Sequence, residues 1–520
     1  MESATIPVGQ PAPDDTSLPG HKGLKRGAIG YISNLVIAVA STAPAYSLAA
    51  TLGFIVAVAG VGTHAPAVLI VAFIPILFVS IGYRYFNFAD PDAGTSFAWV
   101  TRAWGPQLGW INGWAIFLAD IIVMASLSVI ASQYTYLLFS WHWAASSTVM
   151  LIVGSVIWIA VMTWICYRGI ELSARVQTFL LSFELATLTL FVIVALIKVY
   201  ANHPAHSIHV SASWFNPFDM SWGALIPALL LGIFIYWGWD SGVAVNEESR
   251  DSRRGPGKAA IVSTLILLLI YVLTTVAAQA YHGTAFLVNN STDVLNSLAN
   301  DVFGSPLNKL VIIAVLTSAS ASTQTTILPT ARTTLSMAKW NAIPSAFGRI
   351  HPRFLTPTFS TLLMGGLSIV WTIALLAFNP SQDVLGDTIS ALGFAVCFYY
   401  GCTGIACAFY FRKHLFDSVR NFLFAGLIPL VGGLMLAYIG YRSFNFYNDH
   451  ANNYSKALFG IETPILVGIG GLILGVVLMF ASWPFFTTFF HRRWGETADP
   501  KLLAPDVDAE IASGDPRGPG

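Results

Sequence analysis

Twelve long apolar segments dominate this 520-residue chain, and they restrict it to folds that cross a lipid bilayer. Each is near the ~20 residues that a helix needs to span the hydrocarbon layer. Only 10% of the residues are charged, against roughly 25% in a soluble domain. We therefore predict an all-α integral membrane protein with twelve transmembrane helices. The predicted spans are residues 28–60, 67–86, 107–138, 145–166, 172–200, 222–247, 258–283, 307–337, 358–378, 388–411, 421–441 and 463–490.

The basic residues predict how these spans are oriented. With both termini on one side of the membrane, 22 of the 26 Lys and Arg residues fall on that side. The four exceptions are Lys198, Lys309, Arg442 and Lys456. Because cytoplasmic loops retain Lys and Arg, we expect both termini to be cytoplasmic. The same segregation supports an even number of spans.

Two of the spans are interrupted by residues that do not suit a continuous helix in lipid. The first contains Ser41-Thr42-Ala43-Pro44-Ala45, where the proline removes a backbone donor. The sixth contains Tyr236-Trp237-Gly238-Trp239-Asp240-Ser241-Gly242, with an acid and two glycines. Irregular backbone at this depth is tolerated only beside protein, a ligand, an ion or a water-filled cavity. Both breaks therefore indicate a binding site.

The positions of the two breaks suggest how the chain is organised. Interruptions in the first and sixth spans are what an inverted repeat of spans 1–5 and 6–10 requires. We predict a disordered cytoplasmic tail at 1–24, a core at 25–411, helices 11 and 12 at 412–490, and a second tail at 491–520. The segment that ends at Gly105-Pro106, between spans 2 and 3, suggests a short re-entrant or interfacial helix.

Several functional classes find no support in the sequence. The chain lacks a G-x-x-x-x-G-K-[ST] phosphate loop, which disfavours an ATP-driven pump. Its histidines are scattered over outer and inner segments rather than clustered as an enzyme or metal site requires. The formal net charge is zero, so nothing suggests a nucleic-acid partner. We expect no enzymatic activity, no metal and no cofactor.

Three segments resemble motifs of the amino acid-polyamine-organocation permease superfamily, particularly its putrescine-importer-like and amino-acid permease branches. Asp92 to Trp99 resembles the family's "P-E-A-G-S-x-Y" motif, with Asp in place of Glu. Phe234 to Glu248, followed by Arg253 to Ala260, is similar to the family's sixth span and the loop after it. Ser320 to Pro357 is similar to its eighth span and its "R…P…H-P-x-x-x-T-P" loop. The resemblance covers most of residues 25–440.

This resemblance implies a LeuT-like fold with alternating access to a site between the two broken helices. The implied substrate contacts lie in both breaks and on span 3, where Asp120 occurs near the middle of the membrane. In the family, span 1 offers free amides to a substrate carboxylate, but this chain has no glycine there. Carbonyls and aromatic faces of span 6 would receive a substrate ammonium. The implied residues are Ser41, Thr42, Ala43, Pro44, Ala45, Tyr46, Asp120, Tyr236, Trp237, Gly238, Trp239 and Asp240.

The buried acids have two interpretations each. Asp120 and Asp240 could pair with a substrate cation, or they could satisfy neighbouring backbone breaks. Glu184 stands where the resemblance to proton-coupled members places a lysine. It could carry the coupling proton, or it could be a neutral hydrogen-bonding residue between spans 1, 5 and 8. Ser318, Ser320 and Ser322 on span 8 resemble the hydroxyl side of a sodium site, although such residues also favour helix packing.

A charged cluster follows the sixth span. Glu247 and Glu248 lie close in sequence to Arg250 and Arg253, and they could form a cytoplasmic gate. Ordinary surface ion pairs would look the same in the sequence and contribute little.

Together these features predict a secondary-active, proton-coupled permease for an amino acid or a closely related small amine. The expected partners are the small-molecule substrate, a proton and the lipid bilayer, and the expected location is the plasma membrane. A polyamine or organic-cation importer is the alternative, because three intramembrane acids occur without a mid-span Lys or Arg. An amino acid or amine exchanger is a further possibility.

Overall fold

The computed structural model describes residues 22–291, 293–378, 384–453, 455 and 457–491. Within these ranges the protein is α-helical, with isolated bridges in place of β-strands. The described residues contain twelve helices that are long and apolar enough to cross a membrane, which confirms the predicted fold class. Most of the two predicted tails (residues 1–21 and 492–520), together with Lys456, lies outside these ranges.

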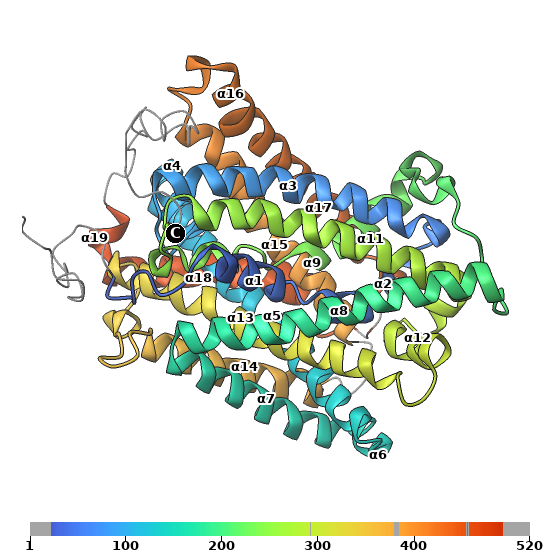
Figure 1. Ribbon diagram of the computed structural model, residues 1–520. Helices are drawn as coiled ribbons and strands as arrows, with labels where there is room; N and C mark the ends of the chain where they lie inside the picture. The colour runs from blue at the N-terminus through green and yellow to red at the C-terminus, as the bar shows by residue number, and fades with distance from the viewer. Residues whose placement is uncertain (1–21, 292, 379–383, 454, 456, 492–520) are drawn as a thin grey trace, which may run out of the picture.

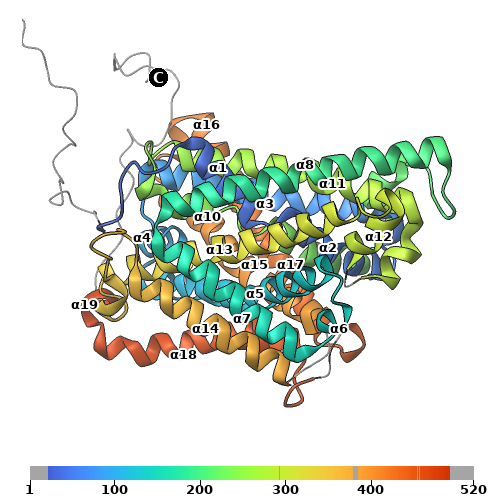
Figure 2. The ribbon, with the colours of Figure 1, turned by 60° about the horizontal axis from the view of Figure 1, so that its bottom comes forward.

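The spanning helices run side by side in one bundle (Figures 1 and 2). Spans 1 and 6 each consist of two helices. Spans 11 and 12 contain π-helical segments (Phe422–Leu427 and Ile465–Ile469) before their main α-helices, and each of the other spans contains one long α-helix. In chain order the helices are α1 (Tyr31–Ser41) with α2 (Pro44–Ala57), α3 (Ala65–Ala89), α5 (Pro106–Leu138), α7 (Thr148–Arg168), α8 (Ile170–Asn202), α9 (Trp222–Tyr236) with α10 (Ser241–Ala244), α11 (Gly255–Asn289), α13 (Lys309–Lys339), α14 (Thr358–Phe378), α15 (Val384–Tyr410), α17 (Ile428–Tyr447) and α18 (Gly470–Ser482).

Shorter helices connect the spans. The predicted short helix between spans 2 and 3 is α4 (Ser96–Trp104), which ends at Gly105 directly before Pro106 starts α5. The other connecting helices are α6 (His142–Ala145) and α12 (Val294–Phe303), whereas α16 (Val419–Asn421) starts the eleventh span and α19 (Thr487–Phe490) follows the twelfth.

The two broken spans lie in the middle of the bundle. In each of them 89% of the most apolar window is buried, against 22% in the twelfth span. The interior therefore belongs to spans 1 and 6, with α5 and α13 packed against each other beside them. The predicted interruptions are confirmed, because α1 ends at Ser41 and α2 starts at Pro44, while α9 ends at Tyr236 and α10 starts at Ser241.

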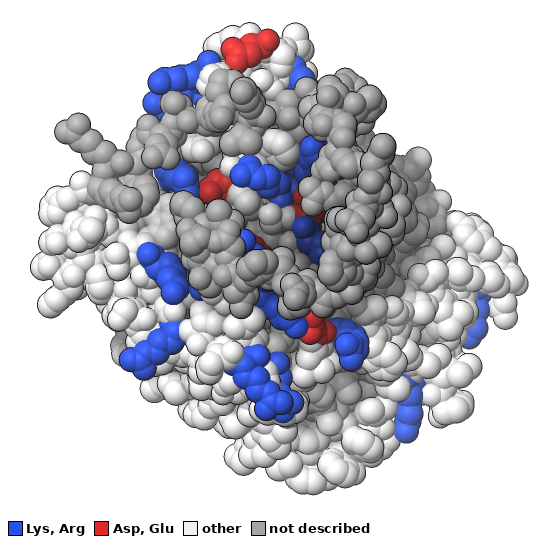
Figure 3. All heavy atoms as spheres, turned by 60° about the vertical axis from the view of Figure 1, so that its left-hand side comes forward, with Lys and Arg blue, Asp and Glu red and all other residues white. Residues whose placement is uncertain are grey.

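One end of the bundle, which we call the basic end, is where α1 starts and α3 ends. Figure 3 shows Lys and Arg side chains gathered on this face, with fewer Asp and Glu side chains among them. This matches the segregation of basic residues in the sequence.

The break in span 6 depends on Gly238, whose φ of 113° is one that other residues adopt only under strain. A Cβ at this position would lie 2.8 Å from the carbonyl oxygen of Ser41 in the first break. Gly238 therefore allows the two interruptions to meet backbone to backbone.

We predict that Gly238→Ala lowers the thermal stability of the purified protein, because strain at positive φ costs roughly 1–3 kcal/mol before the steric clash is counted. Thermal unfolding in detergent measures the effect. Gly366→Ala is the matched control, since a Cβ there meets open space within helix α14. Equal melting temperatures for the two variants would contradict the close contact between the breaks.

Candidate functional site

The break in span 1 is stabilised by its own side chains. Ala43 adopts the left-handed conformation (φ 47°, ψ 67°), and Pro44 then occupies the first turn of α2, where a missing N–H costs little. The Thr42 hydroxyl donates to the Val39 carbonyl at 2.7 Å, and the Ser47 hydroxyl donates to the Thr42 carbonyl at 2.6 Å. Hydroxyls thus satisfy carbonyls that a continuous helix would have paired.

The break in span 6 faces that of span 1. Trp237 is extended (φ −72°, ψ 145°), and Gly238 follows it with its positive φ. Across the gap, the hydroxyls of Ser41 and Ser241 share a hydrogen bond of 2.8 Å. The Ser322 hydroxyl on α13 donates to the Ser41 carbonyl, also at 2.8 Å. The interrupted backbones are therefore tied together and to α13.

A small cavity lies at this junction and combines hydroxyls with apolar side chains. Its space is about 10 Å³, near the minimum for a single water molecule. The site is contracted in this conformation and has to widen around any solute. The lining residues are Ser41, Thr42, Ala43, Tyr46, Ser47, Val123, Leu127, Phe234, Trp237 and Ser322.

Glu184 on α8 lies at the start of α2. Its Oε1 accepts a hydrogen bond of 2.7 Å from the backbone N–H of Ala45, so its carboxyl caps a helix N-terminus, where negative charge is favoured. Its Oε2 has no close hydrogen-bond partner among the described residues, although the Ser318 hydroxyl also acts on the carboxyl. The backbone N–H of Tyr46 donates to the Ser318 hydroxyl at 3.1 Å.

The two other intramembrane acids accept hydrogen bonds from side-chain hydroxyls of the protein. The carboxylate of Asp240 accepts hydrogen bonds from the hydroxyls of Tyr400 (2.7 Å) and Tyr399 (3.2 Å) on α15. Asp120 on α5 accepts a hydrogen bond from the Thr330 hydroxyl on α13. Both acids are buried, and neither lines the small cavity.

Two ion-pair clusters lie at the basic end. The guanidinium of Arg332 donates from Nε and Nη2 to both oxygens of Glu248, at 2.6 and 2.9 Å, and both side chains are buried. The ammonium of Lys22 bonds Asp92 Oδ1 at 3.0 Å and also bonds Glu247. The N-terminal segment is thereby attached across the loop before α4 and the end of span 6.

Lys22 and Asp92 each stabilise the charged form of the other. Burial alone would lower the pKa of the Lys22 ammonium, but the carboxylates of Asp92 and Glu247 raise it above its ordinary value. Burial would likewise raise the pKa of Asp92, but the Lys22 ammonium and the Ser336 hydroxyl hold it below its ordinary value. Both groups are therefore charged at neutral pH. We call the cluster of Lys22, Asp92 and Glu247 the Lys22 latch.

Comparison with known proteins places this arrangement in a family. Residues 29–480 match the family described as "Amino acid permease". The chain belongs to the amino acid permease family. It is therefore a transporter of amino acids across a membrane and not an enzyme, as the sequence predicted.

Several curated relatives resemble this permease over most of their length. An arginine/ornithine antiporter of Latilactobacillus sakei is 23% identical over 78% of this chain and 88% of its own. The Asc-type amino acid transporter 1 of Mus musculus is 23% identical over 85% of this chain and 82% of its own. A branched-chain amino acid permease of Lactococcus lactis is 23% identical over 63% of this chain and 70% of its own.

In this permease the predicted substrate residues separate into two groups. Ser41, Thr42, Ala43, Tyr46 and Trp237 line the cavity. The others lie in the breaks or beside them and contact protein: Pro44, Ala45, Asp120, Tyr236, Gly238, Trp239 and Asp240. Of the span 8 hydroxyls, Ser318 and Ser322 bond to span 1, whereas the Ser320 hydroxyl has no partner among the described residues.

The predicted gate has different ion partners from those expected. We expected Glu247 and Glu248 to face Arg250 and Arg253, but their partners are Lys22 and Arg332. Arg250 is exposed, and Arg253 instead donates to the carbonyl oxygen of Phe88. Neighbours in sequence were a poor guide here, because the helical turn Asn246–Glu248 ends at the extended residue Ser249, and Arg253 beyond it bonds to α3.

Sequence reasoning also missed contacts that arise from distant spans. Val123, Leu127 and Phe234 line the cavity, yet they look like ordinary apolar span residues. The pair Tyr399 and Tyr400 binds Asp240. Two adjacent phenols near the middle of a span were the available signal, since a buried hydroxyl needs a partner.

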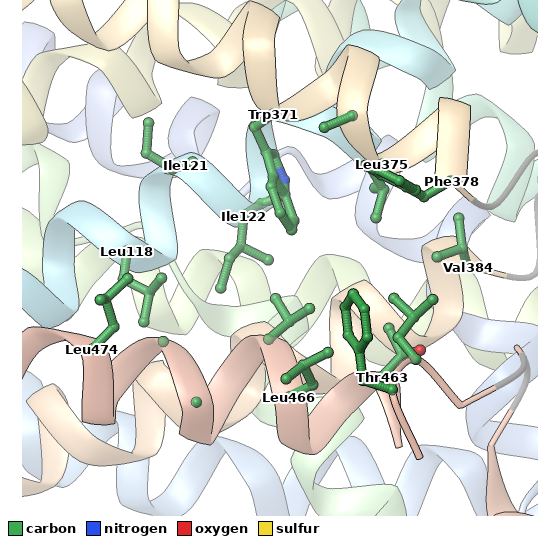
Figure 4. Close-up of a pocket in the computed structure, with 16 residues that line it drawn as sticks. Leu118, Ile121, Ile122, Trp371, Leu375, Phe378, Val384, Thr463, Leu466 and Leu474 are labelled. Carbon is green, nitrogen blue, oxygen red and sulfur yellow. The ribbon is translucent and has the colours of Figure 1, made fainter. Parts of the chain in front are cut away.

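A much larger cavity of about 500 Å³ lies away from the breaks, between α5, α14 and α18 (Figure 4). Its labelled lining residues are apolar apart from Thr463, and Trp371 points into it beside Ile122. It lacks the polar groups that orient a charged solute. The small cavity at the breaks is therefore the candidate substrate site.

We predict that Arg332→Gln strongly destabilises the permease, because Glu248 would be left buried without its counter-charge, at a cost of about 3–5 kcal/mol. Thermal unfolding of the purified variants measures this. Arg250→Gln, at an exposed position, should have little effect. The double variant Arg332→Met/Glu248→Leu should recover much of the loss. Arg332→Gln melting at the same temperature as Arg250→Gln would contradict this assignment.

Proposed function

We propose that this permease carries an amino acid with a small or apolar, uncharged side chain by alternating access, and that a proton taken up by Glu184 drives accumulation. The lining of the candidate site supports the choice of substrate. Hydroxyls of Ser41, Thr42 and Ser322 can bond the charged groups of a zwitterion, while Val123, Leu127 and Phe234 provide an apolar wall for its side chain.

The arrangement of the acids favours this substrate over polyamines and other organic cations. A cationic side chain or a second amine requires a carboxylate in the site. Asp240 and Asp120 are bonded to Tyr399, Tyr400 and Thr330 instead, and the cavity lining contains no acid. The branched-chain amino acid permease among the relatives agrees with this preference by its name.

Glu184 supports coupling to protons. It is fully buried, and no Lys or Arg in the described part of the chain forms an ion pair with it. An isolated carboxylate is costly away from water, whereas the neutral acid costs much less. A proton on Glu184 would also weaken the cap on α2. Uptake of a proton there would therefore alter the hydrogen bond between Ala45 of span 1 and Glu184 of span 5.

We infer that the basic end faces the cytoplasm and that the protein resides in the plasma membrane. The support for this orientation is the gathering of Lys and Arg at that end (Figure 3). In this orientation the Lys22 latch and the Arg332–Glu248 pair form a cytoplasmic gate below the contracted site. Opening toward the cytoplasm then requires both clusters to separate.

Exchange is the second candidate for the mode of transport. One relative is named an arginine/ornithine antiporter, so a strict exchanger is a specific alternative to proton symport. Proteoliposomes without internal amino acid separate the two modes, because a symporter accumulates substrate in them and a strict exchanger does not.

Competition for uptake tests the substrate class. In proteoliposomes we expect unlabelled neutral amino acids to inhibit uptake of labelled L-leucine or L-alanine. Putrescine and L-arginine should inhibit at least tenfold more weakly, since a buried charge without a partner costs several kcal/mol. Stronger inhibition by the diamine would replace this proposal with the organic-cation alternative.

Glu184→Gln tests the coupling. We expect this variant to bind substrate but to lose accumulation driven by an imposed pH gradient, because a glutamine can cap Ala45 but cannot exchange a proton. Glu171→Gln is the control, since Glu171 is half exposed in a surface pair with Lys25. Accumulation by Glu184→Gln equal to that of the control would remove Glu184 from the coupling mechanism.

A further inference from the structure

A polar path continues from the candidate site toward the basic end along two facing helices. On α5, Asp120 precedes the lining residues Val123 and Leu127 by three and seven positions, so all three share one helix face. On α13, Thr326 and Thr330 follow the lining residue Ser322 at intervals of four. The two faces that line the site thus extend one to two turns further toward the basic end.

The groups on this path are not fully satisfied by the protein. The Thr326 hydroxyl is buried and has no hydrogen-bond partner among the described residues, and the same holds for Thr333, one turn beyond Thr330. Asp120 is only 1% exposed. Asp240 is a second carboxyl that acts on it electrostatically. Among the described residues no Lys or Arg forms an ion pair with Asp120.

The hydrogen bond that holds Asp120 is exchangeable. The Thr330 hydroxyl that donates to Asp120 also lies 3.3 Å from the carbonyl oxygen of Thr326 on its own helix. It can turn to that carbonyl without losing a partner. Asp120 would then offer both carboxylate oxygens to a cationic group, beside the unpartnered Thr326 hydroxyl.

We propose that Asp120, Thr326 and Thr330 form a second subsite, on the cytoplasmic side of the main one, that receives the primary ammonium group of the substrate during release. The assignment rests on the proposed function and on the orientation inferred above. The main cavity has no acid, so the ammonium gains a carboxylate partner only after it has moved inward. Asp120 therefore acts on the inward-facing state and leaves binding from outside almost unchanged.

Transport kinetics measured separately on the two faces test this subsite. The KM for labelled L-leucine and L-alanine is determined in right-side-out and inside-out membrane vesicles. We expect Asp120→Asn to raise the KM from the cytoplasmic face by roughly tenfold or more, the usual weight of a hydrogen bond to a charged group. The KM from the outer face should change less than twofold.

Two further variants distinguish a binding role from a structural one. Thr330→Val removes the donor that competes with the substrate for Asp120, and we expect it to lower the cytoplasmic KM. If the Asp120–Thr330 bond served only to hold α5 and α13 together, Asp120→Asn and Thr330→Val would each raise KM on both faces. Thr325→Val is the control, because within the described part of the chain the Thr325 hydroxyl bonds to carbonyls of its own helix.

The chemical class of the ligand is tested with a competitor. The α-hydroxy acid analogue of leucine lacks the ammonium, so it should inhibit the wild type and Asp120→Asn equally from the cytoplasmic face. Equal rises in KM on both faces, or a cytoplasmic KM unchanged by Asp120→Asn, would overturn the subsite. If Asp120→Asn does not fold, a raised cytoplasmic KM in Thr330→Val would overturn it as well. Failure of the wild type to take up either amino acid would instead overturn the proposed function.

Discussion

The need to pair every backbone polar group in a water-free interior governs this structure. Spans 1 and 6 break within the bundle, and each break frees N–H and C=O groups that lipid cannot satisfy. The protein supplies the missing partners from side chains: Ser47 and Ser322 donate to carbonyls of span 1, and Glu184 accepts from its amide. The hydroxyl groups that line the site, and the carboxyl of Glu184 beside it, follow from this requirement.

These partners also connect the site to the helices around it. Glu184 belongs to α8, Ser318 and Ser322 to α13, and Tyr399 and Tyr400 to α15. Each of these hydrogen bonds pairs a polar group of a broken span with a neighbouring helix. Such a bond would have to break if the two helices moved apart. In the proposed mechanism, a few such bonds would link substrate binding and protonation of Glu184 to the movement of spans 1 and 6.

The acids near the middle of the membrane and those at the basic end have different kinds of partner. Near the middle of the membrane, the acids are bonded to hydroxyls and to a backbone amide, and none of them forms an ion pair with a described Lys or Arg. At the basic end, Lys22, Asp92, Glu247, Glu248 and Arg332 form buried ion pairs. Such pairs resist partial opening, because separating one charge from its partner is far more costly than exposing both to water. If these pairs form the proposed cytoplasmic gate, they would favour well-separated closed and open states.

The sequence alone determined the membrane-spanning class, the twelve helices, the two interruptions and the family resemblance. It could do so because bilayer thickness sets helix length and because proline, glycine and acid in an apolar run leave few structural options. It also identified six of the cavity-lining residues, among them Ser41, Trp237 and Ser322. Only the tertiary structure decided which side chains meet. Glu248 pairs with Arg332, 84 residues away, and not with its neighbours, and Asp240 meets phenols of a span 160 residues later. Those partners are chosen by how helices pack in three dimensions, and a hydropathy pattern carries no record of which faces will touch.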